Sequence, residues 1–436
     1  MEPWMVASII VFSLLAFIFT GVPVAFVLTG VSTVLILIFI GPSGLYMIIG
    51  SVFSQISTEV FIAIPLFVLM AVVFQFSGIA SQLYKAMHMW MGSLRGGLAI
   101  GTVIITTIIA ALSGIGATGT ITMGLIALPE MSDRGYNKNM AMGAIAAGGA
   151  LGGIIPPSVL MIVVGGYAQL SVGKLFLGGV LPGFLIALGY CLYIAIRCTL
   201  HPEDGPTLSK KEQGTFKEKL KVLVYVVLPL CMIVFLMGGI YTGAFTPTEA
   251  AGFGALGAIV IAAAQKKLTT SNIKEAIRSS TRVSCMIMWL LIGGGCYSTL
   301  ITITGTGTLV SGILANLPFG TTGVIVAMLI ITLVLGMFID CIAISMICIP
   351  IFVPVLKIFS IDPLWFMLMF VIAAVAGFIT PPFGVNLFYM KGIAPEDVTM
   401  VDIYKGTTPF VLIKVVCLFL CLFFPAILTF LPNLMV

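Results

Sequence analysis

The chain has 436 residues, of which 60% are hydrophobic and only 8% are charged. Because soluble domains carry roughly 25% charged residues, this composition excludes a soluble enzyme or binding module and indicates a polytopic helical membrane protein. The formal net charge of +5 would suggest nucleic acid as a partner of a soluble protein. Here the basic residues fall in loops between apolar segments, where membrane orientation explains them without nucleic acid.

Ten apolar segments are predicted to cross the membrane, since each approaches or exceeds the ~20 residues that a spanning helix needs. The first segment has no basic region before it, so it is predicted to be a span and not a cleaved signal. In chain order the segments are 4–20, 24–41, 60–80, 138–168, 174–197, 222–240, 246–264, 284–303, 364–390 and 406–434.

Two of these segments are predicted to be broken helices. The stretch "GGIIPPSVL" lies at 152–160, and the similar "GFITPPFGV" lies at 377–385, 225 positions later. Proline cannot donate to the helix ladder and clashes with the preceding turn. A proline in a membrane helix can also be a tolerated kink, but matched pairs at corresponding places favour two deliberate breaks.

Two further apolar segments, 98–129 and 322–356, are interrupted in the middle by "SGIGATGT" (113–120) and "GMFIDCIAIS" (336–345). We expect both to be re-entrant hairpins with tips near the middle of the membrane. With this topology 17 of the 20 Lys and Arg residues lie on the cytoplasmic side, as the positive-inside rule requires. The first hairpin then opens to the cytoplasm, the second opens outward, and both termini face outward.

The two halves of the chain are predicted to form an inverted repeat, because each has an odd number of crossings and the breaks correspond. The expected fold class is therefore an all-α polytopic membrane protein with two re-entrant hairpins and two broken helices. Broken helices at corresponding positions of an inverted repeat are the best sequence indication of a secondary transporter.

Each hairpin tip is expected to face one break, because freed backbone groups survive in hydrocarbon only when buried in protein or lining a polar cavity. Freed carbonyls offer hard oxygen ligands to a cation such as Na⁺, and half-helix N-termini favour an anionic solute. Small or oxygen-bearing residues at these places fit such a site. They are Ser113, Gly114, Gly116, Thr118, Gly119, Thr120, Gly152, Gly153 and Ser158 in the first half, and Asp340, Ser345, Thr380 and Asn386 in the second.

Asp340 is the most informative of these residues, because it is the only acidic residue between Glu275 and Asp362 and is expected deep in the membrane. Such a residue is functional by default. It could neutralise a cation, accept a proton or pair with a distant base, or it could only bond a neighbouring helix. The glycines could likewise serve only close helix packing.

The nine cysteines form no CxxC pair, and only two histidines occur in the sequence. We interpret the cysteines as small hydrophobic residues. The sequence contains no nucleophile–base arrangement and no transition-metal motif. We therefore expect no catalytic residues, no enzymatic activity, and no metal other than Na⁺.

Several stretches together resemble the large membrane subunit of tripartite ATP-independent periplasmic (TRAP) transporters over essentially the whole chain. They are "GVPVAFVLTG", "IPLFVLMAVVFQFSGIASQLY", "LSGIGATGT", "GGIIPPSVLMIVVGGYAQLSVGKLFLGGVLPG" and "GFITPPFGVNLFYMKGIAP". The resemblance implies an elevator-type transporter of the bacterial inner membrane, driven by a sodium gradient. It also implies a separate small four-helix membrane subunit and a periplasmic binding protein that delivers a carboxylate such as a C4-dicarboxylate or sialic acid.

The resemblance also implies a division into scaffold and transport domains and a set of site residues. The scaffold would comprise 1–58 and 222–283, the transport domain 59–199 and 284–436, and a cytoplasmic linker 200–221. One sodium site would involve Ser113, Gly114, Gly152, Gly153 and Pro156, and a second Gly336, Asp340, Thr380, Pro382 and Gly384. The solute would contact Thr118, Ser158 and Asn386.

Two alternatives to a tripartite importer remain open from the sequence. A stand-alone sodium/anion symporter of the same broad fold would need no binding protein. A passive channel would not accumulate its solute against a gradient. An intramembrane enzyme is disfavoured, because no catalytic constellation is visible.

Overall fold

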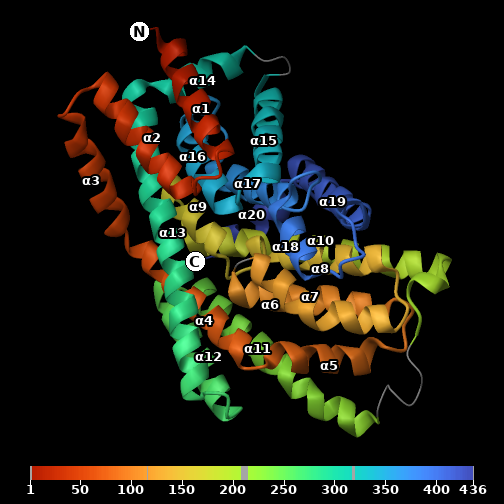
Figure 1. Ribbon diagram of the computed structural model, residues 1–436. Coiled ribbons are helices and arrows are strands. Elements are labelled where there is room, and N and C mark those ends of the chain that lie inside the picture. The colour runs from red at the N-terminus through yellow and green to blue at the C-terminus, as the bar shows by residue number, and fades with distance from the viewer. Residues whose placement is uncertain (1, 115, 208–214, 317–319, 436) are drawn as a thin grey trace.

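The computed structural model describes residues 2–114, 116–207, 215–316 and 320–435, and within these ranges the chain is helical without any β-strand (Figure 1). Ile115 of the first predicted tip, and 208–214 of the predicted linker, lie outside the described residues. The first half contains α1 (Pro3–Phe19), α2 (Val24–Phe39), α3 (Gly44–Ile56), η1 (Glu59–Ile62), α4 (Ala63–Phe76), α5 (Ile79–Met91), α6 (Gly97–Ser113), α7 (Gly116–Asp133), α8 (Lys138–Ala150), η2 (Leu151–Gly153), α9 (Val159–Ala168) and α10 (Val172–Leu200).

The second half begins after the short helix η3 (Pro202–Asp204). It contains α11 (Phe216–Tyr241), α12 (Pro247–Ala264), α13 (Thr270–Thr304), α14 (Thr306–Ala315), α15 (Gly320–Phe338), α16 (Cys341–Ile358), α17 (Pro363–Gly377), α18 (Val385–Ile393), α19 (Met400–Phe423) and α20 (Ala426–Asn433). Eight helical stretches among the described residues are long and apolar enough to cross a membrane. This confirms the predicted all-helical membrane protein.

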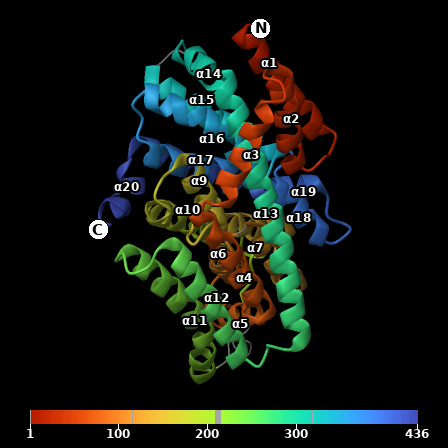
Figure 2. The same cartoon turned by 90° about the vertical axis from the view of Figure 1, so that its left-hand side faces the viewer.

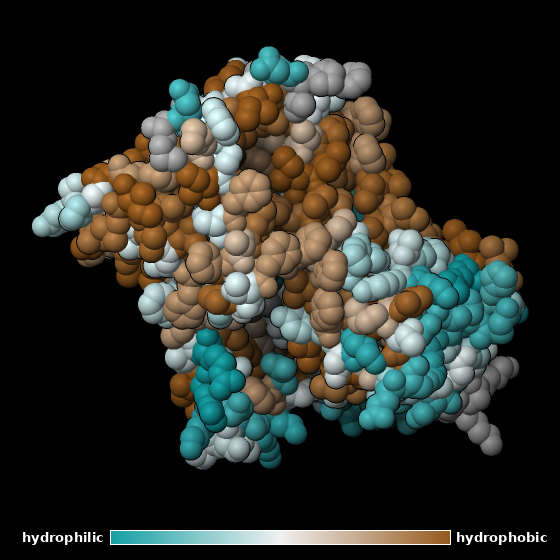
Figure 3. Space-filling view, turned by 45° about the horizontal axis from the view of Figure 1, so that its top comes forward, coloured by the Kyte–Doolittle hydropathy of each residue, from teal (hydrophilic) through white to brown (hydrophobic). Residues whose placement is uncertain are grey.

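The surface agrees with a membrane environment. Many large apolar side chains are exposed, among them Phe12 at 72% and Phe53 at 72%. The face seen in Figure 3 is mostly hydrophobic, and hydrophilic residues gather along its lower edge. A soluble protein rarely exposes apolar patches of this extent, so lipid is the natural cover for this surface.

Both predicted helix breaks are confirmed. The segment 138–168 consists of α8 and α9, which are separated by irregular backbone over 154–158. The segment 364–390 consists of α17 and α18, with irregular backbone over 378–384. Each break contains a pair of prolines, which explains why neither helix continues.

Two predicted spans had wrong boundaries. The span 60–80 ends earlier, because α4 stops at Phe76 and Gly78 adopts a left-handed φ of +75° before α5. The span 284–303 belongs to a longer helix that starts at Thr270, capped by the Thr269 hydroxyl. Charged residues at 274–282 suggested a loop, but charges at the end of a membrane helix are compatible with helical backbone.

The last predicted span, 406–434, is also not a single helix. It divides into α19 and α20 at Phe424, where the backbone leaves the helical region. Pro425 follows directly and cannot donate a backbone hydrogen bond to the preceding turn. The C-terminal end therefore turns back against α10, which α20 contacts.

The centre of the fold is α8, whose residues from Met140 to Ala150 are all buried. It packs against α6, α7 and α19, so helices of both halves cover it (Figure 1). The crossing with α19 is very close, because a methyl group on Gly143 would come within 2.1 Å of the Gly406 carbonyl oxygen. Figure 2 shows α13 running along the height of the molecule beside α2, α3 and α4, which it contacts.

A polar clamp joins the end of α10 to the starts of α6 and α8. The Asp204 carboxylate accepts hydrogen bonds from Arg197 Nε and from Asn137 Nδ2, both at 2.7 Å. The backbone N–H of Gly96 donates to the Gly205 carbonyl at 2.9 Å. Burial opposes ionisation of Asp204, but the hydrogen bonds from Arg197 and Asn137 and the charge of Arg197 outweigh it and lower the pKa of this carboxyl.

The Gly143–Gly406 crossing predicts an asymmetric response to alanine. In Gly143→Ala the new methyl group meets backbone that cannot move aside, so we expect a loss of roughly 1–3 kcal/mol in the free energy of unfolding. Gly252→Ala, in α12 with nothing within 4 Å of the added methyl group, is the control and should be neutral or slightly stabilising. Thermal unfolding in detergent measures both, and equal midpoints for the two variants would contradict the crossing.

The polar clamp predicts a pH-dependent contribution to stability. Because the pKa of Asp204 is lowered in the folded protein, its contribution is present above the unfolded pKa of about 3.9 and is lost as pH falls through the folded value. We expect Asp204→Asn to lower the unfolding midpoint at pH 7, with a difference from wild type that shrinks only below about pH 4, as pH falls through the folded value. Glu203→Gln, whose parent side chain is 73% exposed, should not change the midpoint at either pH.

Candidate functional site

The first break is the irregular backbone between η2 and α9, whose polar groups lack the regular hydrogen bonds of a helix. After η2 the chain passes through Pro156 and Pro157, which have no N–H to donate. Ser158 then caps α9, since its hydroxyl accepts from Met161 N at 3.3 Å and donates to the Gly153 carbonyl at 2.9 Å. The Ser158 side chain is fully buried.

The first tip lies directly against this break, as predicted. Helix α6 ends at Gly114, which adopts a left-handed φ of +62°. The Gly114 carbonyl accepts a hydrogen bond from Val159 N, the first residue of α9, at 3.3 Å. A methyl group on Gly152 would lie 2.6 Å from the Ala110 carbonyl oxygen. Tip and break therefore meet backbone to backbone, without room for side chains.

The second break repeats this arrangement with different bonds. The Thr380 hydroxyl donates to the Ala376 carbonyl at 2.7 Å, and Gly384 N donates to the Thr380 carbonyl at 3.0 Å. A methyl group on Gly377 would lie 2.7 Å from the Cα of Gly336. The second tip therefore also packs on the second break, as predicted.

One cavity brings both tips and both breaks together. Its volume is about 250 Å³, and its walls come from α6–α9, α13 and α16–α18. Of the residues proposed from the sequence, five line it, namely Gly114, Gly116, Thr118, Gly153 and Asp340. Its other lining residues are Ala117, Ile121, Ala150, Leu160, Val283, Met286, Ile287, Cys341, Ile342, Val375, Phe378 and Tyr389.

Two long helices begin at the wall of this cavity. Gly116, Ala117 and Thr118 form the first turn of α7, and Cys341 and Ile342 begin α16. A helix N-terminus carries unsatisfied N–H groups and partial positive charge. Two such ends from opposite halves therefore create a favourable place for negative charge.

Asp340 is the acidic group of the cavity. Its Oδ1 accepts from Ile342 N at 2.9 Å, so the carboxylate caps α16. Within the described part of the chain, no ion pair involves Asp340. The carboxylate is half-buried and faces the cavity without a cationic side chain to neutralise it.

Asn386 links the two halves. It is fully buried, and its Nδ2 donates to Thr120 Oγ1 at 2.9 Å and to the Ala146 carbonyl at 2.8 Å. Its Oδ1 is buried and finds no hydrogen-bond partner in the described residues. In this conformation Asn386 and Ser158 hold helices together and do not line the cavity.

The remaining predicted site residues lie behind the wall or beside it. Ser113 is buried, and its hydroxyl donates to the Ala110 carbonyl at 3.0 Å. The Pro382 carbonyl accepts a hydrogen bond from the Tyr404 hydroxyl. Gly152, Pro156, Gly336, Thr380 and Gly384 belong to the breaks and tips but are not cavity-lining residues.

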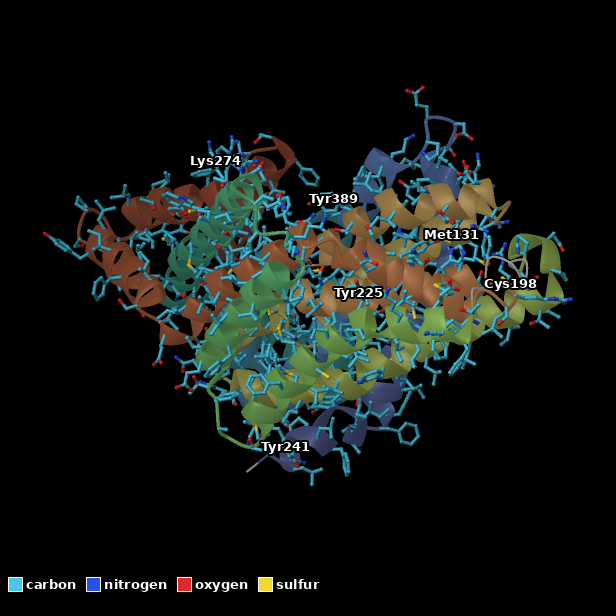
Figure 4. The ribbon with its side chains drawn as sticks, turned by 90° about the horizontal axis from the view of Figure 1, so that it is seen from below. Met131, Cys198, Tyr225, Tyr241, Lys274 and Tyr389 are labelled. Carbon is cyan, nitrogen blue, oxygen red and sulfur yellow. The ribbon has the colours of Figure 1, made fainter. Side chains whose placement is uncertain are left out.

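Sequence reasoning missed part of the cavity wall. Tyr389 lies three residues after Asn386 on α18, so helical spacing from the break could have indicated it (Figure 4). Val283, Met286 and Ile287 come from α13, and no local pattern marks them. A larger cavity of about 600 Å³ between α5, α7 and α11 is lined by none of the proposed residues and by no residue of either break.

The donor set suits a hard cation. Backbone carbonyls, hydroxyls and one carboxylate are oxygen ligands of the kind that alkali and alkaline-earth cations take. Across the described ranges, no group of three or more His, Cys, Asp or Glu residues comes together. The arrangement thus offers oxygen ligands for a cation beside two helix N-termini for an anion.

Comparison with known proteins identifies the family of this chain. A family model described as the DctM component of the tripartite ATP-independent periplasmic transporter matches residues 11–427. The C4-dicarboxylate TRAP transporter large permease protein DctM of Vibrio cholerae is 30% identical over 395 residues, which cover 86% of each chain. The isethionate TRAP transporter permease protein DctMQ of Oleidesulfovibrio alaskensis is 29% identical over 383 residues, covering 86% of this chain but only 58% of that longer protein.

A solved structure supports the fold. The crystal structure of the Alcanivorax borkumensis YdaH transporter aligns with a TM-score of 0.63 and 12% identity, covering 94% of this chain and 98% of that one. Similarity at this identity concerns the fold alone. Because the family model spans nearly the whole chain, the protein belongs to the DctM component family of tripartite ATP-independent periplasmic transporters and is a transport protein, not an enzyme.

Proposed function

We propose that this chain is the large membrane subunit of a sodium-coupled importer for a carboxylate solute in the bacterial inner membrane. The observation that carries this proposal is the single cavity into which both tips and both breaks converge. Irregular backbone at membrane depth is tolerated where it lines such a cavity, and transporters place their substrate and ion sites there.

The cation part of the proposal rests on oxygen atoms at the breaks. In the first half Ser113, Gly114, Gly152, Gly153 and Pro156 would provide hydroxyl and carbonyl ligands for one Na⁺. In the second half a second Na⁺ would be bound by oxygen atoms of Gly336, Asp340, Thr380, Pro382 and Gly384. Asp340 is the only ionised ligand in this set, so it would contribute most to neutralising the bound charge.

The anion part rests on the N-termini of α7 and α16. Both helices have 18 residues, and their first turns line the cavity. Thr118 lies in the first turn of α7 and offers a hydroxyl to a solute carboxylate. Ser158 and Asn386 would contact the solute only after the packing around them opens, because both are fully buried here.

For the transport step we propose an elevator motion with both hairpins re-entrant. The transport domain, 59–199 and 284–436, would carry the cavity past the scaffold, 1–58 and 222–283. The boundary at 283–284 falls inside the continuous helix α13. Motion there would therefore involve α13 as a unit, or bending at Gly293–Gly295, where three consecutive glycines lower the cost of a bend.

The family implies two partners, a small membrane subunit and a periplasmic binding protein. We propose that both are separate chains for this protein, and that the binding protein selects the solute. The C4-dicarboxylate relatives support a dicarboxylate as the first solute to test.

The decisive experiment is uptake of radiolabelled succinate and sialic acid into proteoliposomes that contain this chain with its small subunit. We expect accumulation only with the binding protein outside and an inward sodium gradient. Sodium-driven uptake without any binding protein would instead identify a stand-alone symporter. Equilibration without accumulation, unaffected by replacing sodium with potassium, would identify a passive channel.

Asp340 allows a sharper test, because asparagine also caps helices well. In Asp340→Asn the start of α16 stays capped while the negative charge is lost. We expect the sodium concentration for half-maximal uptake to rise at least about tenfold, with little change in the unfolding midpoint in sodium-free buffer.

The matched control for this test is Asp362→Asn. Asp362 caps α17 with the same geometry, since its Oδ1 accepts from Leu364 N at 2.9 Å, but it does not line the cavity. This variant should transport like wild type. Normal sodium dependence in Asp340→Asn would remove Asp340 from the proposed site.

A further inference from the structure

Lys414 of α19 is a buried amine that the proposed site does not use. Its side chain is fully buried, and no other Lys, Arg, Asp or Glu in the described ranges falls in the buried class. Placing a charged group inside a membrane protein is costly, so it needs a compensating partner. The position of Lys414 therefore requires an explanation beyond packing.

The partner of Lys414 is the C-terminal end of α17. Its Nζ donates to the Val375 carbonyl at 3.2 Å. The N–H of Ile379, which would satisfy this carbonyl in a continuous helix, donates to Ala376 instead. The second break thus leaves the Val375 carbonyl without its helical hydrogen bond, and the Lys414 ammonium donates to this carbonyl instead. The contact lies at the C-terminal end of a helix, where positive charge is favoured.

This contact lies directly behind the cavity wall. Val375 lines the cavity, and so does Cys341, whose thiol donates to the neighbouring Ala374 carbonyl at 3.5 Å. Cys341 follows Asp340, the acidic residue of the second proposed sodium site. Lys414 itself does not line the cavity, and no carboxylate lies within 4 Å of its Nζ in the part of the chain that the structure describes.

The first half has no such charge at the corresponding place. Subtracting the repeat offset of 225 from 414 gives Gly189 on α10. A methyl group there would already lie 2.7 Å from Cγ2 of Ile413, the neighbour of Lys414. The two proposed sodium sites therefore differ in having one buried ammonium on the side of the second break.

We propose that the Lys414 ammonium is a tethered internal cation that lowers the sodium affinity of the second break. This inference rests on the sodium coupling proposed above. By Coulomb's law, two unit charges about 10 Å apart at an effective dielectric constant near 20 repel by an energy that corresponds to about a tenfold change in a binding constant. Weakening one of two ion sites would favour release of that ion into the low-sodium cytoplasm.

The test measures sodium binding to the purified protein in detergent. The readout is the midpoint of thermal unfolding. Sodium chloride is titrated against choline chloride at constant ionic strength, because a ligand that binds the folded state raises the midpoint with its concentration. The variants are Lys414→Met, which removes charge and donor, Lys414→Gln, which keeps a donor, and Lys414→Arg, which keeps the charge. Lys405→Gln, on the exposed end of the same helix, is the control.

We expect the half-saturating sodium concentration to fall on the order of tenfold in Lys414→Met and Lys414→Gln alike. It should stay near the wild-type value in Lys414→Arg and Lys405→Gln. If Lys414→Met fails to fold, Lys414→Gln and Lys414→Arg still separate charge from hydrogen bonding.

Two outcomes would overturn the inference, and they are distinct from failure of sodium coupling itself. An unchanged sodium dependence in the neutral variants would show that Lys414 only satisfies the Val375 carbonyl. A higher half-saturating concentration would show that it supports sodium binding. If sodium and choline act identically on wild-type protein, the proposed sodium coupling fails, and this inference fails with it.

Discussion

The fold depends on the need to satisfy backbone groups that the two proline breaks release inside an apolar interior. An unsatisfied carbonyl or N–H in hydrocarbon costs several kcal/mol, so each break must recruit partners. The first break recruits the tip of α6, through Val159 N and the Gly114 carbonyl. The second recruits Lys414, from α19, for the Val375 carbonyl. The demands of the breaks thus bring segments distant in sequence into contact.

This constraint reconciles two interpretations of the glycines. Gly152 and Gly377 serve close packing, since added methyl groups would meet backbone atoms at 2.6 Å in both cases. Close packing is also what brings freed backbone of a tip and a break near the same cavity. At these positions the same close contacts pack the helices and position the backbone of the proposed site. A substitution that opens the packing would therefore also displace oxygen atoms proposed as ligands.

Much of this architecture could be predicted because its determinants are local. Paired prolines mark the breaks, and small residues mark the tips, whatever the rest of the chain does. Features that depend on tertiary contacts could not be predicted. The wall residues Met286 and Ile287 look like any apolar residues of a helix, and the partner of Lys414 cannot be identified until α17 is placed beside it. The charged start of α13 was misassigned because charge indicated a membrane boundary but not the end of the helix.

The charges around the cavity also give a physical reason for the proposed coupling of an anion to sodium. Two helix N-termini contribute about half a positive charge each, Asp340 contributes one negative charge, and the ammonium proposed for Lys414 adds a positive charge behind the wall. These contributions leave a modest positive excess in a space of about 250 Å³. A solute carboxylate is attracted by that excess, and once bound it cancels the excess and so removes the repulsion that opposes cation binding nearby. By reciprocity, bound sodium strengthens binding of the carboxylate to the same degree. On the proposed function, coupling thus follows from the shared low-dielectric cavity and requires no direct bond between the two ligands.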